Sequence, residues 1–135
     1  MKKLASKAIQ TAATIKNYCF SKGLIQPHEV AIPVISVGNI AAGGSGKTSL
    51  AQWLVREIKD VAVLTRGYRS QMEHKSPGLI NSQCDPRICG DEPAMLARMK
   101  ESPLVYVGKN RCASAKMAAE DGAKVLVLDD GMQYR

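Results

Sequence analysis

The stretch PVISVGNIAAGGSGKTSL, residues 33–50, decides the fold that we expect for this chain. It begins within an apolar, β-branched run, residues 31–38, which is typical of a buried strand. Glycines follow, and Lys47 and Thr48 then open a segment, residues 47–60, with the apolar spacing of a helix. A strand, a glycine-rich loop and Gly-Lys-Thr at the start of a helix, in that order, predict a loop that binds phosphate.

The chemistry of such a loop depends on its backbone and on two side chains. Glycines allow backbone N–H groups to surround phosphate oxygens, and the helix N-terminus adds partial positive charge. We expect Lys47 to reach the β- and γ-phosphates of a nucleotide and the Thr48 hydroxyl to bind Mg²⁺. Ala41 stands where the strict phosphate-loop pattern has its first glycine. The alternative to a phosphate-binding loop is a turn with a purely structural role. The expected nucleotide-binding residues are Gly43, Gly44, Ser45, Gly46, Lys47 and Thr48.

Strands and helices alternate along the rest of the chain. Short apolar runs predict strands at 61–65, 104–108 and 124–130, and the segments between them predict helices at 91–100 and 109–121. Residues 66–90, rich in Gly, Pro, Ser, Asn and Asp, predict a long loop. The core face expected for helix 47–60 consists of Leu50, Trp53, Leu54 and Ile58. This order predicts an α/β, P-loop NTPase-like three-layer fold with a mainly parallel sheet.

Acidic residues lie where ligands of such a fold bind, beyond the carboxyl ends of the strands. Asp129 and Asp130 end the last expected strand, where a carboxylate would hold Mg²⁺ beside a phosphate loop; solvated turn aspartates are the alternative. Asp91 and Glu92 open a helix. Their spacing alone favours helix capping, and the functional alternative is a carboxylate that accepts a proton from an attacking hydroxyl.

The composition restricts the partners. The chain has 135 residues, 45% of them hydrophobic and 4% aromatic, and a formal net charge of +7, which favours an anionic partner. We expect no nucleic-acid partner, because one Phe and one Trp provide no stacking platform. Arg66 and Arg69 could contact phosphates or lipid, with solvated charge as the default interpretation. The four cysteines (Cys19, Cys84, Cys89 and Cys112) match no zinc spacing, and we expect reduced thiols.

The N-terminal segment differs in character from the rest. We divide the chain into residues 1–30, a basic amphipathic helix and linker, and residues 31–135, a nucleotide-binding domain. Polar residues interrupt the apolar positions of the helix, so neither a signal peptide nor a membrane-spanning helix is expected. A helix lying on an anionic membrane surface and a helix packed on the domain remain alternatives.

Five segments within residues 33–133 match the motifs of one known family, namely PVISVGNIAAGGSGKTSL, VAVLTRGYRS, CGDEPAMLA, PLVYVGKNRCASA and VLVLDDGMQ. Together they resemble the tetraacyldisaccharide 4'-kinase (lipid A 4'-kinase) family of Gram-negative bacteria, in its N-terminal part. The resemblance implies that the γ-phosphate of ATP passes, with Mg²⁺, to the 4'-hydroxyl of an acylated glucosamine disaccharide 1-phosphate lipid. It also implies a peripheral enzyme at the cytoplasmic face of the inner membrane, with the N-terminal helix docked on that surface.

The resemblance also implies roles for individual residues. Asp91 matches the catalytic base of the family and Lys47 its phosphate-binding lysine. Thr48, Asp129 and Asp130 match the metal-binding residues. Residues in matching motifs that are expected to line the site are Ser45, Tyr68, Glu92 and Arg111.

The chain departs from the family in three places. Tyr134 stands where the family usually has His, and Arg69 stands where glycine is common. Family members are more than twice as long as these 135 residues. We therefore expect the N-terminal part of a kinase, and the alternative is a truncated, catalytically inactive P-loop nucleotide-binding fragment.

Overall fold

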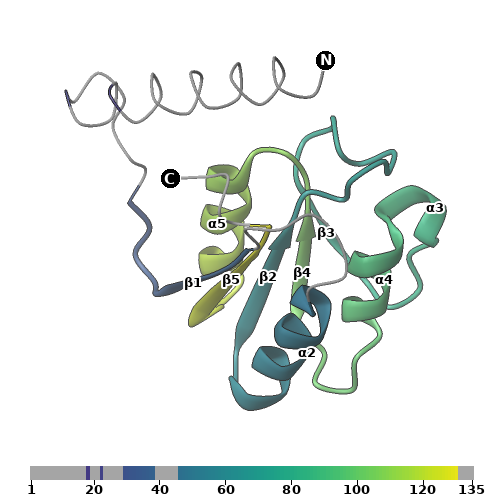
Figure 1. Cartoon of the computed structure of the whole chain (residues 1–135), viewed down its shortest axis with the longest axis horizontal. Coiled ribbons are helices and arrows are strands. Elements are labelled where there is room, and N and C mark those ends of the chain that lie inside the picture. Colours follow the sequence, from purple (N-terminus) through teal and green to yellow (C-terminus); the bar gives the residue numbers. More distant parts are fainter. Residues whose placement is uncertain (1–17, 19–21, 23–28, 39–45, 131–135) are drawn as a thin grey trace, which may run out of the picture.

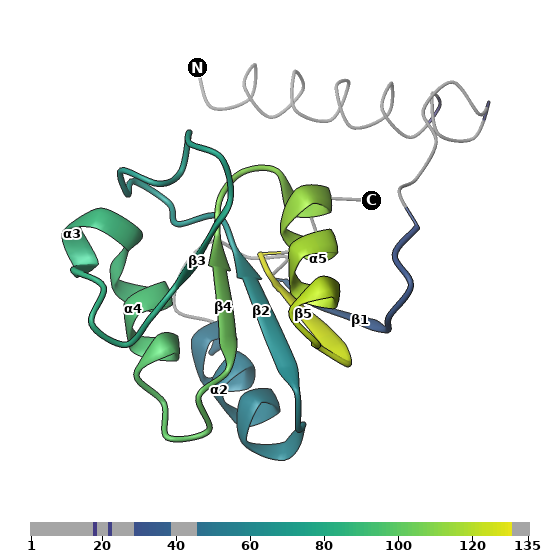
Figure 2. The ribbon, with the colours of Figure 1, turned by 180° about the vertical axis from the view of Figure 1, so that it is seen from behind.

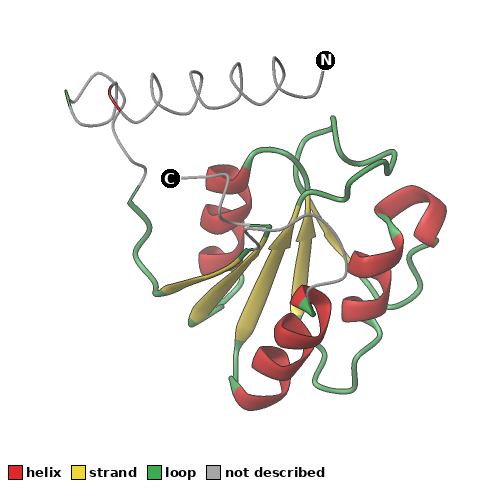
Figure 3. Ribbon diagram, viewed as in Figure 1, coloured by secondary structure: helices red, strands yellow, loops and turns green. Residues whose placement is uncertain are grey.

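The structure is a computed structural model, and it describes Tyr18, Lys22, residues 29–38 and residues 46–130. Figure 1 shows the elements along the chain, and Figure 3 colours them by type. The strands are β1 (Val34–Val37), β2 (Val61–Thr65), β3 (Gly78–Ile80), β4 (Leu104–Val107) and β5 (Val125–Asp129). The helices are α2 (Lys47–Glu57), α3 (Pro86–Cys89), α4 (Asp91–Ala97) and α5 (Arg111–Glu120).

One sheet of five strands, in the order β1-β5-β2-β4-β3, forms the centre of the fold. The first four strands in this order are parallel, and β3 is antiparallel to β4. Val37 of β1 pairs with Asp129 of β5, so the strand that precedes the expected phosphate loop ends beside the strand that ends in aspartate. The predicted mainly parallel sheet is confirmed.

Helices cover both faces of this sheet, as opposite views of the ribbon show (Figures 1 and 2). Side chains of β2 alternate between the two faces of the sheet. Val61 and Val63 pack with α2 and α4 on one face, and Ala62 and Leu64 pack with α5 on the other. All five residues of β2 are buried, as expected for a central parallel strand. The three-layer arrangement is therefore confirmed.

The segment predicted as a long loop, residues 66–90, contains two short elements, and that prediction was wrong in this respect. β3 has three residues, too few for an apolar pattern to be visible in the sequence. α3 is one turn long and is capped at Asp85, whose carboxylate accepts the N–H of Arg87 at 2.9 Å.

The core face predicted for α2 was also partly wrong. Leu50 and Trp53 are 47% and 54% exposed. The helix instead buries Ala51, Leu54 and Val55, and it ends at Glu57 because Ile58 is extended. Small Ala51 lies against the sheet, which rotates the two larger side chains toward solvent.

Several predictions lie outside the described residues. These include most of the N-terminal segment 1–30, the loop residues Gly43, Gly44 and Ser45, and Tyr134. The division into residues 1–30 and 31–135 therefore stays a prediction. Within the described part of the chain, no helix is long and apolar enough to cross a membrane.

Candidate active site

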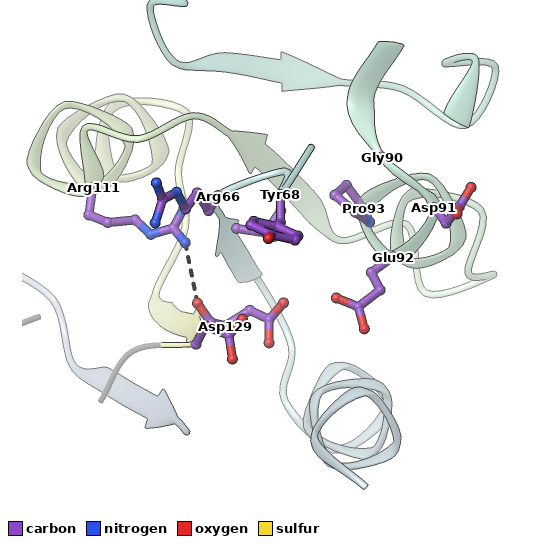
Figure 4. Close-up of a pocket in the computed structure, with 10 residues that line it drawn as sticks. Arg66, Tyr68, Gly90, Asp91, Glu92, Pro93, Arg111 and Asp129 are labelled. Carbon is purple, nitrogen blue, oxygen red and sulfur yellow. Dashed lines mark hydrogen bonds between the residues drawn. The ribbon is translucent and has the colours of Figure 1, made fainter. Parts of the chain in front are cut away.

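A cavity of about 480 Å³ opens at the edge of the sheet where the parallel strands end (Figure 4). Its walls come from the ends of β2 and β5, the turn after β2 and the first turns of α4 and α5. The lining residues are Thr65, Arg66, Tyr68, Gly90, Asp91, Glu92, Pro93, Arg111, Asp129 and Asp130. This position agrees with the rule that ligands of α/β sheets bind beyond the carboxyl ends of the strands.

Two contacts connect the start of α2 to this cavity. The Lys47 ammonium donates to the Asp130 carboxylate, and this hydrogen bond is the main reason that the pKa of Lys47 is raised. The Thr48 hydroxyl donates to Glu92 Oε1 at 2.8 Å. Side chains from α2, α4 and the end of β5 therefore meet at one place, although 83 residues separate Lys47 from Asp130.

Asp129 is the buried member of this group, with 7% of its surface exposed. Burial raises its pKa, and the negative charges of Glu92 and Asp130 raise it further. The positive charges of Lys47 and Arg111 act in the opposite direction but do not reverse the shift. Asp129 is therefore a carboxylate that is buried and has like charges beside it.

Arg111 connects three elements beneath the cavity. It is 7% exposed, and its Nη1 donates to the Gly108 carbonyl at 3.0 Å. Its Nη2 donates to the backbone carbonyl of Asp129 at 3.3 Å. Arg111 is the first residue of α5, and Asn110 caps this helix because its side-chain oxygen accepts the N–H of Ala113. Arg111 thereby fixes the end of β5, where the two aspartates lie.

Asp91 and Glu92 differ in direction. Figure 4 shows the Glu92 carboxylate directed toward Asp129 and the Asp91 carboxylate directed away from it. The helix-capping interpretation of Asp91 was wrong, because the N-cap of α4 is Gly90 and no side chain caps this end. Asp91 still lines the cavity, and its catalytic role stays a prediction.

The remaining predicted residues have different environments. Gly46 precedes α2 with φ +74°, and its carbonyl accepts the N–H of Leu50 at 2.9 Å. Tyr68 is 68% exposed at the cavity, and the Arg69 guanidinium lies 5.2 Å from its ring centre. Arg66 follows β2 directly and lines the cavity, so the rule that ligands bind beyond strand ends favours a phosphate contact over the default interpretation of a solvated charge.

The residues at the site suit a magnesium ion that binds together with phosphate. The described residues contain no group of three or more His, Cys, Asp or Glu side chains that could hold a metal by themselves. Mg²⁺ ordinarily takes one or two carboxylates and completes its shell with water and phosphate oxygens. Asp129, which is buried and has two further carboxylates beside it, fits this kind of coordination.

The parallel sheet, the Gly-Lys-Thr start of α2 and the aspartates that end β5 define the class of P-loop nucleotide-binding proteins. Residues 3–135 match the sequence model of the tetraacyldisaccharide-1-P 4'-kinases. A tetraacyldisaccharide 4'-kinase of Aromatoleum aromaticum is 38% identical over 130 residues, and one of Dechloromonas aromatica is 41% identical over 118. The chain belongs to the tetraacyldisaccharide 4'-kinase family.

A solved structure supports the same placement. The crystal structure of the "apo" form of LpxK from Aquifex aeolicus in complex with ATP has a TM-score of 0.77 and 31% identity over 89% of this chain. The chain covers 40% of that protein, and it covers 37% and 34% of the Aromatoleum and Dechloromonas relatives. It therefore spans about a third of the length of the curated relatives that it matches.

Proposed function

We propose that this chain is the nucleotide-binding part of a kinase that transfers the γ-phosphate of ATP to the 4'-hydroxyl of tetraacyldisaccharide 1-phosphate. The observation that carries the proposal is the convergence of Lys47, Thr48, Glu92 and the two aspartates at one cavity edge. The names of the relatives and the ATP of the Aquifex structure support the reaction and the donor.

The proposed donor is ATP with Mg²⁺. Thr48, Asp129 and Asp130 would hold the ion, and Glu92 lies within hydrogen-bond distance of Thr48 to orient it. The ion, when bound, would neutralise phosphate charge as the phosphoryl group moves. The Lys47 ammonium, which pairs with Asp130 in this structure, would then contact the β- and γ-phosphates.

The proton of the acceptor hydroxyl needs a base. We assign it to Asp91, which lies at the exposed rim of the cavity, where a bulky acceptor can approach. Because phosphoryl transfer needs mainly positioning and electrostatic stabilisation, we expect Lys47 to contribute more to the rate than the base does.

The test is transfer of labelled γ-phosphate from Mg-ATP to tetraacyldisaccharide 1-phosphate in detergent micelles. Label in the lipid with this chain, and its loss in Lys47→Ala, would support the proposal. Binding of Mg-ATP without label in the lipid would favour the alternative of a nucleotide-binding fragment without catalysis. If the chain neither binds Mg-ATP nor transfers label to the lipid, the proposal is contradicted.

We also propose that the protein acts at the cytoplasmic face of the inner membrane, held peripherally by the basic segment 1–30. Lys2, Lys3 and Lys7 in that segment would attract anionic lipid headgroups. Co-sedimentation with vesicles of anionic and of neutral lipid tests this. We expect binding to the anionic vesicles only, reduced by Lys3→Glu with Lys7→Glu; equal binding to both vesicle types would contradict the proposal.

A further inference from the structure

Arg66 is held on one side by a buried carboxylate and lines the cavity on the other. It follows β2 directly, and Figure 4 shows it on the same side of the cavity as Arg111. Its Nε lies 2.6 Å from Glu73 Oε1. The side chain of Glu73 is 8% exposed, whereas that of Arg66 is 34% exposed. Glu73 is therefore the buried partner of this ion pair, and Arg66 is the partner that solvent or a ligand reaches.

Glu73 also fixes the turn that carries Arg66. Its Oε2 accepts the backbone N–H of Arg69 at 2.9 Å, and its own N–H donates to the Ser70 carbonyl at 3.3 Å. The hydrogen bond from Arg69 is the main reason that the pKa of Glu73 is lowered, and the charge of Arg66 lowers it further. Glu73 is thus an ionised group that accepts the Arg69 N–H at one end of the turn and forms an ion pair with Arg66 at the other.

Packing prevents the turn from shifting. Gly67 has φ +65°, and a Cβ at this position would lie 2.4 Å from Val107 Cγ1 of β4. The turn therefore lies directly on the sheet. Since its backbone is fixed, the direction of the Arg66 side chain depends on the contact with Glu73.

We propose that Glu73 is a positioning residue that holds the Arg66 guanidinium at the cavity. The guanidinium binds a phosphate group of a substrate there. The inference rests on the proposed function, in which the phosphate belongs either to ATP or to the 1-position of the acceptor lipid. A carboxylate at Nε leaves the terminal nitrogens of an arginine for a second anion, and the planar guanidinium matches phosphate geometry. No pattern in the sequence marks Glu73 for this role.

The first experiment follows the Arg66 Nε–H group by NMR in the whole chain without ligand. We expect a rigid side chain in the wild type, with a high ¹⁵N heteronuclear NOE at Nε, and a mobile one in Glu73→Gln. Gln has nearly the same size and keeps an oxygen for the Arg69 N–H, but it removes the charge. Glu120→Gln, at the exposed end of α5, is the matched control. Equal mobility of Arg66 in wild type and Glu73→Gln would overturn the inference.

The second experiment is a double-mutant cycle on ligand affinity. We expect Arg66→Gln to weaken binding by about tenfold, as for the loss of a charge-assisted hydrogen bond. Glu73→Gln should weaken binding by a smaller factor and should have no further effect in the Arg66→Gln background. Separate titrations with Mg-ATP and with the acceptor lipid in micelles show which phosphate Arg66 binds. Additive effects of the two substitutions would indicate a merely structural role of Glu73 and would overturn the inference.

The two experiments separate the inference from the function on which it rests. A wild-type chain that binds neither ligand would contradict the proposed function, and the NMR comparison would still decide whether Glu73 orders Arg66. If Glu73→Gln lowers the melting temperature strongly, Glu73→Asp takes its place, because Asp keeps the charge. We expect the Arg66 side chain to be partly ordered in this variant. No recovery at all, with the fold intact, would count against the inference.

Discussion

At the scale of single residues, the site is an arrangement of charges that a ligand would complete. Glu92, Asp129 and Asp130 meet opposite Lys47, and the hydrogen bond with Asp130 raises the pKa of Lys47. Burial, followed by the like charges, raises the pKa of Asp129. A carboxylate that is buried beside like charges costs stability, and a further cation bound there would reduce that cost.

Asp129→Asn tests the cost of burying this carboxylate beside like charges. The raised pKa means that the folded chain binds a proton more readily than the unfolded chain, so the wild type gains stability as pH falls from the raised pKa toward the usual value of Asp. We expect the variant to unfold at higher temperature than the wild type near neutral pH, with a difference that shrinks on acidification. A thermal unfolding series across pH checks this, and a variant less stable than wild type at every pH would contradict it.

Thr48→Val tests the hydroxyl at the start of α2. Valine has a similar shape but cannot donate to Glu92 or bind a metal, so the benefit of Mg²⁺ for ATP binding should fall by about tenfold. Thr48→Ser keeps the hydroxyl and serves as the control. ATP titrations with and without Mg²⁺ measure the effect. An unchanged response to Mg²⁺ in the Val variant would show that Thr48 is no ligand.

At the scale of elements, the site depends on turns that pack directly on the sheet. Gly67 and Gly122 both have positive φ, at +65° and +92°. A Cβ at Gly67 would collide with Val107, whereas nothing lies within 4 Å of a Cβ at Gly122. The two positions therefore separate backbone strain from steric conflict.

Gly67→Ala should destabilise the fold by about 2–4 kcal/mol, because it adds a clash to the strain of a positive φ. Gly122→Ala should cost only about 1 kcal/mol, because it adds the strain alone. Urea unfolding of both variants gives the comparison. Equal losses would mean that the turn after β2 does not lie tightly on β4.

The orientation of α2 gives a second comparison at this scale. Leu54 is 8% exposed, and Leu54→Ala should cost about 2–4 kcal/mol through lost burial and a cavity. Trp53 is 54% exposed, and Trp53→Gln should change stability by no more than about 0.5 kcal/mol. Urea midpoints of the two variants measure the difference. A large loss for Trp53→Gln would restore the helix face that the sequence suggested.

The elements show what local patterns in the sequence can predict. Continuous apolar runs placed the four parallel strands, and Gly-Lys-Thr placed the start of α2. The three residues of β3 carry no readable pattern, and the apolar spacing of α2 was misleading because Ala51 occupies the face that contacts the sheet. Local patterns thus predict elements well and predict the rotation of a helix poorly.

At the scale of the whole molecule, the topology assembles the site. β5 lies between β1 and β2, so Val37 pairs with Asp129 although they are far apart along the chain. The strand-end rule predicted that Asp129 and Asp130 lie at the same edge as Lys47. It could not predict the strand order, the contact of Glu92 with Thr48 or the anchoring of Arg66 by Glu73, because these arise from tertiary packing.

The most direct test of the central claim, that this edge of the sheet is a Mg-ATP site, is a calorimetric titration of the chain with ATP in the presence and absence of Mg²⁺. We expect saturable binding that is stronger with Mg²⁺ and that Lys47→Ala weakens by about a hundredfold, since the lysine binds the β- and γ-phosphates. Absence of binding, or equal affinity in wild type and Lys47→Ala, would contradict the account.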